Sequence, residues 1–191
     1  SEPGFLQSLF PFLTKLPRSL LPGRLKFIKD FSDTSKPVGA AFNNPSLISQ
    51  DGMEANTKQW RNAEIPAANG HGTARSIAKL YGILANGGSR DGIHVLKPET
   101  IEMSRLPQSE GKDLVLGGMN TKFGLGFMLG NENISMGPNI KSFGHGGAGG
   151  SLGFCDPDNH VSLGFVMNQM HPGITAWKTA TDLASSVYKS L

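Results

Sequence analysis

A glycine-rich segment near the C-terminal end constrains this chain more than any other feature. Residues 144–153 include six glycines, and a single histidine, His145, stands among them. Because glycine loses more backbone entropy on folding than any other residue, this concentration indicates tight turns or a close approach of the backbone to another group. Apolar residues alternate over 152–154 and again over 161–167, on either side of the turn Asp156–Asn159. This pattern predicts a β-hairpin.

Amphipathic helices are predicted on both sides of this hairpin. Thr73 is a residue type that caps helix N-termini, and Gly87 and Gly88 are typical of a helix end. Between them, four apolar residues recur with helical spacing: Ile77, Leu80, Tyr81 and Leu84. A second helix is expected at the C-terminus, where one face would be made of Ile174, Trp177, Thr181, Ala184, Val187, Tyr188 and Leu191.

Shorter elements complete the expected fold. A short strand or turn is expected at 92–96, a helix at 99–105 after Pro98, and a further strand at 123–129. Residues 30–70 show little periodicity and predict mostly loop. Antiparallel strands with flanking helices make α+β the expected fold class, an antiparallel β-sheet flanked by helices.

Charge and cysteine content exclude several classes of function. The net charge of +3 arises within the first 30 residues, which contain five basic and two acidic side chains, and the remaining residues are balanced. A nucleic-acid-binding face needs a basic patch, so we expect no nucleic-acid partner. No apolar run approaches the roughly 20 residues that cross a bilayer. The single cysteine, Cys155, excludes an internal disulfide and a cysteine-based zinc cluster, and we expect neither a metal nor a cofactor.

Two sequence motifs within the glycine-rich segment have alternative meanings. Gly144-x-Gly146-x-x-Gly149 matches the dinucleotide-binding fingerprint, but that fingerprint requires a following helix and an acidic residue about 20 positions on. A strand is expected there instead, so we reject it. The nucleophile-elbow pattern G-x-S-x-G around Ser151 also requires a helix after the serine. An α/β-hydrolase that uses Ser151 is therefore a minor alternative.

A third interpretation needs no nucleophile in this segment. A glycine-flanked edge strand lets a substrate approach the backbone closely and presents an N–H group to a developing oxyanion. His145 would then point into the same cleft as a hydrogen-bond donor or a cation. The structural alternative is a tight bend that carries an exposed histidine.

Three stretches together resemble a known family. Residues 67–88, 123–127 and 143–151 are similar, in order and in spacing, to the C-terminal half of the serine β-lactamase and penicillin-binding-protein superfamily. The resemblance is to the class C-like branch of esterases and lactamase domains, which has H-x-G where other members have K-T-G. It implies an incomplete β-lactamase-like domain over residues 51–191, after an unassigned arm or loop-rich segment at 1–50.

The resemblance also implies the site residues. His145, Gly146 and Gly147 would occupy the H-x-G strand, and the backbone N–H of Ala148 would be one of two oxyanion donors. On the cleft rim, the implied substrate-binding residues are Asn69 and His71.

The nucleophile of that family is expected outside this chain. The family places its S-x-x-K and Y-x-N motifs upstream of residue 69, and the S-x-x-K matches found here, which begin at Ser76, Ser109 and Ser186, are expected by chance. Only Ser76, in the first turn of a helix with Lys79 one turn on, is a rival. Tyr81 and Tyr188 lie after residue 69, so neither fits the family's tyrosine.

The functional hypothesis follows from these features. The resemblance implies part of a larger serine hydrolase that cleaves small esters or amides through an acyl-enzyme, while this chain alone would be inactive. The alternative is a non-catalytic binding or assembly module. Unpaired strand edges would favour self-association or pairing with the missing half of the domain.

Overall fold

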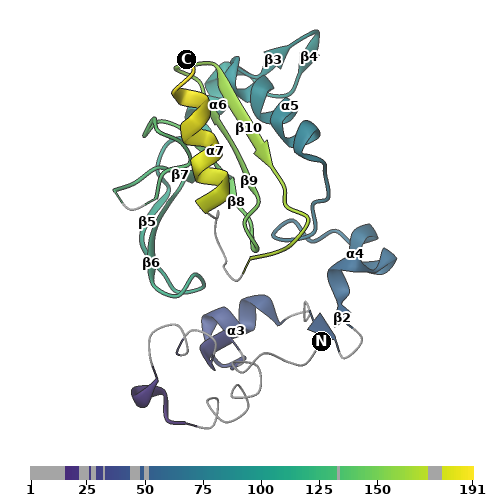
Figure 1. Cartoon of the computed structure of the whole chain (residues 1–191), viewed down its shortest axis with the longest axis vertical. Coiled ribbons are helices and arrows are strands. Elements are labelled where there is room, and N and C mark those ends of the chain that lie inside the picture. Colours follow the sequence, from purple (N-terminus) through teal and green to yellow (C-terminus); the bar gives the residue numbers. More distant parts are fainter. Residues whose placement is uncertain are drawn as a thin grey trace. The chain divides into compact units, whose positions relative to one another are not determined.

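The structure is a computed structural model of the 191-residue chain (Figure 1). It describes residues 16–21, 26, 29–31, 33–43, 48–49, 52–132, 134–171 and 178–191. The chain divides into two compact units, the first made of residues 1–70 with 113–118 and the second of residues 71–112 with 119–191. Among the described residues, no helix is long and apolar enough to cross a membrane. The domain boundary at residue 50 stays a prediction.

The second unit is organised around a six-stranded sheet with the order β10-β9-β8-β7-β6-β5. Its strands are β5 (Ser109–Asp113), β6 (Met119–Phe123), β7 (Met128–Leu129), β8 (Phe143–Gly146), β9 (Leu152–Asp156) and β10 (Val161–Phe165). All pairings from β6 to β10 are antiparallel. With the helices that pack against it, this sheet confirms the predicted α+β class (Figure 1).

The predicted hairpin forms as β9 and β10. Val161 is paired with Asp156 and Phe165 with Leu152. The prediction of a single strand at 123–129 is wrong, because a turn separates β6 from β7. The Gly124 N–H donates to the Phe127 carbonyl at 2.9 Å, which reverses the chain direction within a few residues.

Helix α5 (Ala74–Ala85) covers one face of the sheet, and its N-terminus is capped as predicted. The Thr73 hydroxyl accepts a hydrogen bond from the Ser76 N–H, and the Ser76 side chain accepts one from the Thr73 N–H, forming a capping box. The helix packs closely on β9 and β10 because glycines lie beneath it. A Cβ atom at Gly153 would lie 2.6 Å from the Tyr81 ring, and one at Gly164 would lie 2.4 Å from the Ala74 carbonyl oxygen.

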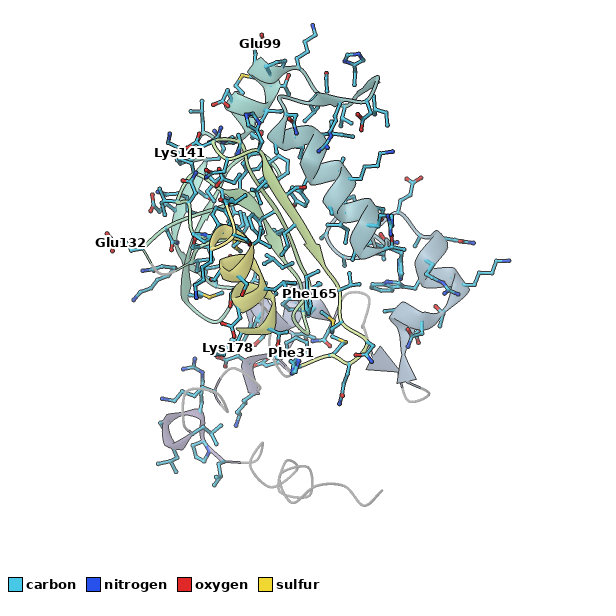
Figure 2. All side chains as sticks on the ribbon, turned by 45° about the horizontal axis from the view of Figure 1, so that its top comes forward. Phe31, Glu99, Glu132, Lys141, Phe165 and Lys178 are labelled. Carbon is cyan, nitrogen blue, oxygen red and sulfur yellow. The ribbon has the colours of Figure 1, made fainter. Side chains whose placement is uncertain are left out.

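Helix α7 (Lys178–Tyr188) packs on the opposite face. Successive residues of a strand point to opposite faces, so Asp156 lies on the other side from Gly153 and Cys155. The Tyr188 hydroxyl donates to Asp156 at 2.6 Å. Lys178, at the start of α7, is labelled in Figure 2. Ile174 and Trp177, which were expected in this helix, lie outside the described residues.

One hydrophobic core cluster of the second unit lies between α5 and the sheet. Its buried members are Leu84, Ala85, Ile101, Leu129, Phe143 and Cys155, against which Tyr81 and Phe127 pack. Ile101 belongs to α6 (Pro98–Ser104), which begins at the proline that the sequence indicated. Beside it, β3 (Ser89–Arg90) and β4 (Ile93–His94) form a separate two-stranded sheet.

The first unit has short elements. They are a 3-10 helix (Arg18–Leu20), α3 (Pro37–Phe42), β1 (Ile48–Ser49), β2 (Gly52–Met53), a second 3-10 helix (Glu54–Asn56) and α4 (Lys58–Asn62). Helices α3 and α4 interrupt the region that was predicted to be mostly loop. They are too short for a periodic pattern, and local signals begin them: Pro37 is the first residue of α3, and the Thr57 hydroxyl accepts from the Trp60 N–H at the start of α4.

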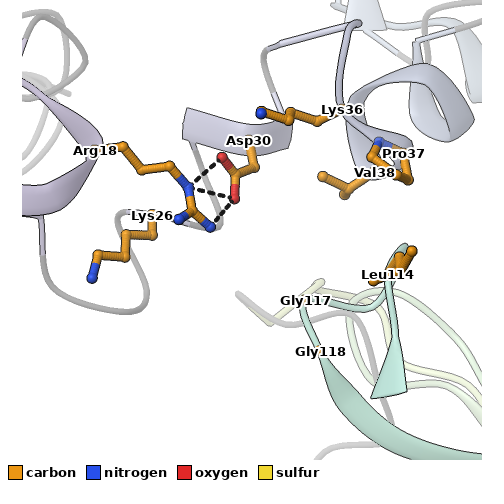
Figure 3. Close-up of a pocket in the computed structure, with 9 residues that line it drawn as sticks. All are labelled: Arg18, Lys26, Asp30, Lys36, Pro37, Val38, Leu114, Gly117 and Gly118. Atoms are coloured by element: carbon orange, nitrogen blue, oxygen red, sulfur yellow. Dashed lines mark hydrogen bonds and ion pairs between the residues drawn. The ribbon is translucent and has the colours of Figure 1, made fainter. Parts of the chain in front are cut away.

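This unit also contains a cavity of about 460 Å³ (Figure 3). Its lining includes three basic side chains, those of Arg18, Lys26 and Lys36, and one acidic side chain, that of Asp30. The guanidinium of Arg18 donates to both carboxylate oxygens of Asp30, at 2.7 to 3.1 Å. The hydrogen bonds from Arg18 lower the pKa of Asp30.

Candidate functional site

His145 lies on β8 at the end of the sheet where α5 begins. It is exposed and is paired with Gly153 of β9, which in turn is paired with Gly164 of β10. Residues directly opposite each other in an antiparallel sheet share a face, so His145 is on the face that α5 covers. The first turn of α5 lies over Gly164. The N-terminus of α5 and His145 therefore share one end and one face of the sheet.

The edge of β8 is open at His145. Strand β7 has two residues, which pair with Phe143 and Gly144. In the described sheet, His145 and Gly146 thus extend beyond β7 and pair only with β9. A substrate can approach the backbone along such an unpaired segment.

The glycines after His145 close the turn between β8 and β9. The Gly147 N–H donates to the Ser151 carbonyl at 2.8 Å, and the Gly150 N–H donates to the Gly147 carbonyl at 3.0 Å. Ala148 is exposed within this turn. Within the part of the chain that the structure describes, the N–H of Ala148 has no intramolecular acceptor. This N–H is therefore available to a ligand, and its role as an oxyanion donor stays a prediction.

The two predicted rim residues have different surroundings. Asn69 organises its own loop: its amide nitrogen donates to the carbonyls of Trp60 (2.9 Å) and Ala63, and its oxygen accepts from the Ile65 N–H at 3.0 Å. Asn69 belongs to the first unit, whereas His71 is exposed just before α5 in the second. Both substrate contacts remain predictions, and only His71 shares a unit with His145.

The rival nucleophiles have structural roles or the wrong context. The Ser76 hydroxyl accepts from the Thr73 N–H and donates to the Thr73 carbonyl, each at 2.9 Å, and Lys79 is exposed. Ser151 leads directly into β9. A nucleophile elbow needs a helix at that point, so the structure provides none around Ser151.

The Tyr81 hydroxyl and the Cys155 thiol, both near the core, are poorly suited to catalysis. Burial, with a smaller contribution from Cys155, raises the pKa of Tyr81 to about 12. Burial likewise raises the pKa of the Cys155 thiol to about 12. Both groups stay protonated at neutral pH, where a catalytic base or a thiolate nucleophile must be deprotonated.

No metal site is evident in the described residues. In that part of the chain, no three histidine, cysteine, aspartate or glutamate side chains gather where they could hold a metal ion.

Two contacts in the second unit were not predicted from the sequence. The ring of Phe123 packs against His145, with 5.9 Å between centroids. The carboxylate of Asp156 is buried among Tyr188, Asn139 and Asn159. Neither contact has a local sequence signal, because each joins residues from different elements.

Comparisons with known proteins point to one family. The family model described as Beta-lactamase matches residues 29–185, so the match begins within the segment that the sequence left unassigned. The chain is 41% identical over 108 residues to Esterase/beta-lactamase LipL of Mycobacterium tuberculosis. That alignment covers 56% of this chain and 24% of LipL.

Solved structures with the same fold are also similar in sequence. A family VIII carboxylesterase has a TM-score of 0.72 at 36% identity, and a penicillin-binding-protein homologue from Caulobacter crescentus has a TM-score of 0.70 at 37% identity. EstA from Arthrobacter nitroguajacolicus Rue61a has a TM-score of 0.67 at 28% identity. These alignments cover 81–82% of this chain but only 40–41% of the solved chains. The chain therefore spans less than half the length of these relatives.

Proposed function

The chain belongs to the beta-lactamase family, and from that premise we propose that it is a portion of a serine hydrolase that cleaves small esters or amides through an acyl-enzyme. In this proposal β8 and the turn after it supply the oxyanion strand and one wall of the cleft. His145 lines that wall, and the N–H of Ala148 stabilises the negative charge that develops on the carbonyl oxygen of the substrate. Asn69 and His71 contribute to the rim.

The open end of β8 supports this proposal most strongly. His145 is exposed beyond the end of β7, and in the turn after it the Ala148 N–H has no acceptor among the described residues. A single preorganised oxyanion-hole donor typically contributes about 10²–10³-fold to the rate of acyl transfer. The names of the similar proteins, an esterase/beta-lactamase and a carboxylesterase, agree with an ester or amide substrate.

We place the nucleophile outside these 191 residues. Ser76 is engaged as a helix cap, and Ser151 has no helix after it to form an elbow. The attacking serine, its S-x-x-K lysine and the Y-x-N tyrosine would come from sequence that pairs with this chain to complete the domain. By itself, the chain would then be inactive, and it would self-associate or pair with the rest of the domain.

Covalent labelling of the native polypeptide tests this proposal. An antibody raised against residues 71–191 captures the native protein together with any sequence that flanks these residues. The captured protein and the 191-residue chain are each treated with a fluorophosphonate, which modifies activated serines. Peptide mapping then locates the adduct.

The expected adduct is on a serine outside the 191 residues, with no adduct on the isolated chain. An adduct on Ser76 or Ser151 would show a self-contained site and contradict the proposal. Failure to label the native protein, while a known serine esterase in the same reaction is labelled, would favour a non-catalytic binding or assembly module.

A further inference from the structure

Two contacts hold the imidazole ring of His145. Its Nδ1 lies 2.6 Å from the carbonyl oxygen of Gly146, the next residue on β8. Its ring also packs against that of Phe123 on β6, with 5.9 Å between centroids and 32° between planes. Since the backbone occupies one ring nitrogen, Nε2 is the nitrogen that remains for a ligand.

The contact with Gly146 decides which nitrogen of the neutral ring carries the proton. A carbonyl oxygen can only accept a hydrogen bond, so Nδ1 must be the donor. A neutral imidazole has a single N–H, and Nε2 then keeps its unshared electron pair. We infer that neutral His145 is held as the Nδ1–H tautomer and offers Nε2 as a hydrogen-bond acceptor, with Phe123 as a positioning residue for the ring.

The consequence of this tautomer for substrate binding rests on the proposed function, and it narrows the class of substrate. The sequence suggested a donor or a cation at this position, whereas the neutral Nδ1–H ring presents an acceptor. An acceptor pairs with a hydroxyl or an amide N–H of the substrate, but two acceptors, such as Nε2 and a carboxylate, have no proton to share. Neutral His145 would therefore favour substrates that carry a hydroxyl or N–H group over those that carry a carboxylate.

Phe123 favours the Nδ1–H tautomer because it holds the imidazole ring of His145 in the orientation that bonds Gly146. It is half-buried on β6 and lies against the imidazole, so it limits the ring rotations that would break the hydrogen bond to Gly146. Replacing Phe123 with leucine keeps an apolar side chain but removes the planar surface. Phe165, a half-buried phenylalanine at the end of β10, provides a matched control.

Nuclear magnetic resonance of the whole 191-residue chain tests the tautomer directly. Long-range ¹H–¹⁵N correlation spectra of the chain labelled with ¹⁵N-histidine are recorded at a pH where the rings are neutral. His145 is assigned by the signal that disappears in His145→Ala. We expect Nδ1 to resonate as a protonated nitrogen and Nε2 as an unprotonated one. The reverse assignment, or averaged shifts for the two nitrogens, would overturn the inference.

The role of Phe123 is tested in the same spectra. The ratio of Nδ1–H to Nε2–H forms should fall roughly 2- to 10-fold in Phe123→Leu, the range expected when a single hydrogen bond is weakened. Phe165→Leu should leave the ratio unchanged, and Phe123→Met is a second variant if Phe123→Leu does not fold. An unchanged ratio in a folded Phe123 variant would remove its positioning role.

Substrate choice is measured separately on the native polypeptide. The preference for p-nitrophenyl 3-hydroxybutyrate over p-nitrophenyl hemisuccinate should decrease roughly 2- to 10-fold in His145→Ala. An unchanged preference would show that His145 does not select hydroxyl-bearing substrates over carboxylate-bearing ones. The spectra need no hydrolysis, so a failure of the proposed function and a wrong tautomer give different results.

Discussion

Gly153 and Gly164 show what the lack of a side chain does in this protein. Both lie beneath α5, and a Cβ atom on either would overlap the helix, at 2.6 Å from the Tyr81 ring or 2.4 Å from the Ala74 carbonyl oxygen. The sequence suggested that glycines in this region open a cleft to the substrate. These two instead permit close packing of a helix on the hairpin, and the open edge of β8 arises from the short length of β7.

Gly153→Ala should therefore destabilise the protein by about 1–3 kcal/mol, the usual cost of overpacking a filled core. Urea unfolding followed by circular dichroism measures this change. Gly70→Ala is the matched control, because a Cβ atom at Gly70 would meet nothing within 4 Å. Equal midpoints for the two variants would contradict the packing described here.

The tautomer of His145 depends on contacts that the sequence does not reveal. The sequence indicated that His145 lies on a strand near a cleft, and the structure places it on β8 with its side chain exposed. It could not indicate which ring nitrogen is free, since that depends on the local geometry of Gly146 and on a ring contributed by another strand.

A buried carboxylate joins α7 to the hairpin. Asp156 ends β9 and accepts hydrogen bonds from the Tyr188 hydroxyl (2.6 Å) and from the side-chain amides of Asn159 and Asn139 (each 2.8 Å). Burial alone would raise the pKa of Asp156, but these hydrogen bonds outweigh it and hold the pKa below its usual value. Asn139 also donates to Asp158 at 3.1 Å, and Asp158 forms an ion pair with Lys141 at 3.1 Å. Lys141 is labelled in Figure 2.

Tyr188→Phe should lower the free energy of unfolding by about 1.5–3 kcal/mol, the typical contribution of a hydrogen bond to a charged group. Urea unfolding at pH 7 measures the loss. Ser186→Ala removes an exposed hydroxyl from the same helix and should have little effect. If Tyr188→Phe and Ser186→Ala were equally stable, the hydrogen bond between Tyr188 and Asp156 would not contribute to holding α7 on the hairpin.

Because the pKa of Asp156 is low in the folded chain, we expect the protein to lose stability in acid. Because the pKa of Asp156 is lower in the folded than in the unfolded chain, its contribution is fully present above the unfolded value, about 3.9, and is lost as the pH falls through the folded value. Unfolding free energies measured from pH 7 to pH 3 should fall more steeply in the wild type than in Asp156→Asn. Parallel curves would contradict this assignment.

Local patterns account for the elements that the sequence predicted. Helix α5 and the β9–β10 hairpin have clear periodicity, a capping threonine and a turn rich in aspartate and asparagine. Helices α3 and α4 are too short to show periodicity, and the loose alternation at 123–129 concealed a chain reversal. The contact between Asp156 and Tyr188 could not be predicted, because it depends on how α7 packs against the sheet.

The second unit has its own core, although the chain covers only 40% of a solved relative such as the family VIII carboxylesterase. Cys155, the only cysteine, lies fully buried in that core. Burial raises the pKa of its thiol to about 12, which further suppresses the reactive thiolate at neutral pH. Its reactivity therefore reports whether the core is intact in the isolated chain.

Ellman's reagent should react with Cys155 only as fast as the core opens. We expect negligible reaction in native buffer at pH 7.5 and release of one equivalent of thiolate in denaturing urea. Fast, complete reaction in native buffer would show that the second unit does not hold its core without the rest of a β-lactamase-like domain.

We propose that the open end of β8, with His145, forms a wall of a serine-hydrolase cleft. The most direct test compares kcat/KM for p-nitrophenyl 3-hydroxybutyrate between His145→Ala and His94→Ala in the native polypeptide. His94 is an exposed histidine whose ring bonds Ser89 in a separate two-stranded sheet. We expect a decrease of roughly 2- to 10-fold for His145→Ala, which removes the hydrogen bond that Nε2 would accept from the substrate, and little change for His94→Ala. Equal activity in the two variants would contradict it.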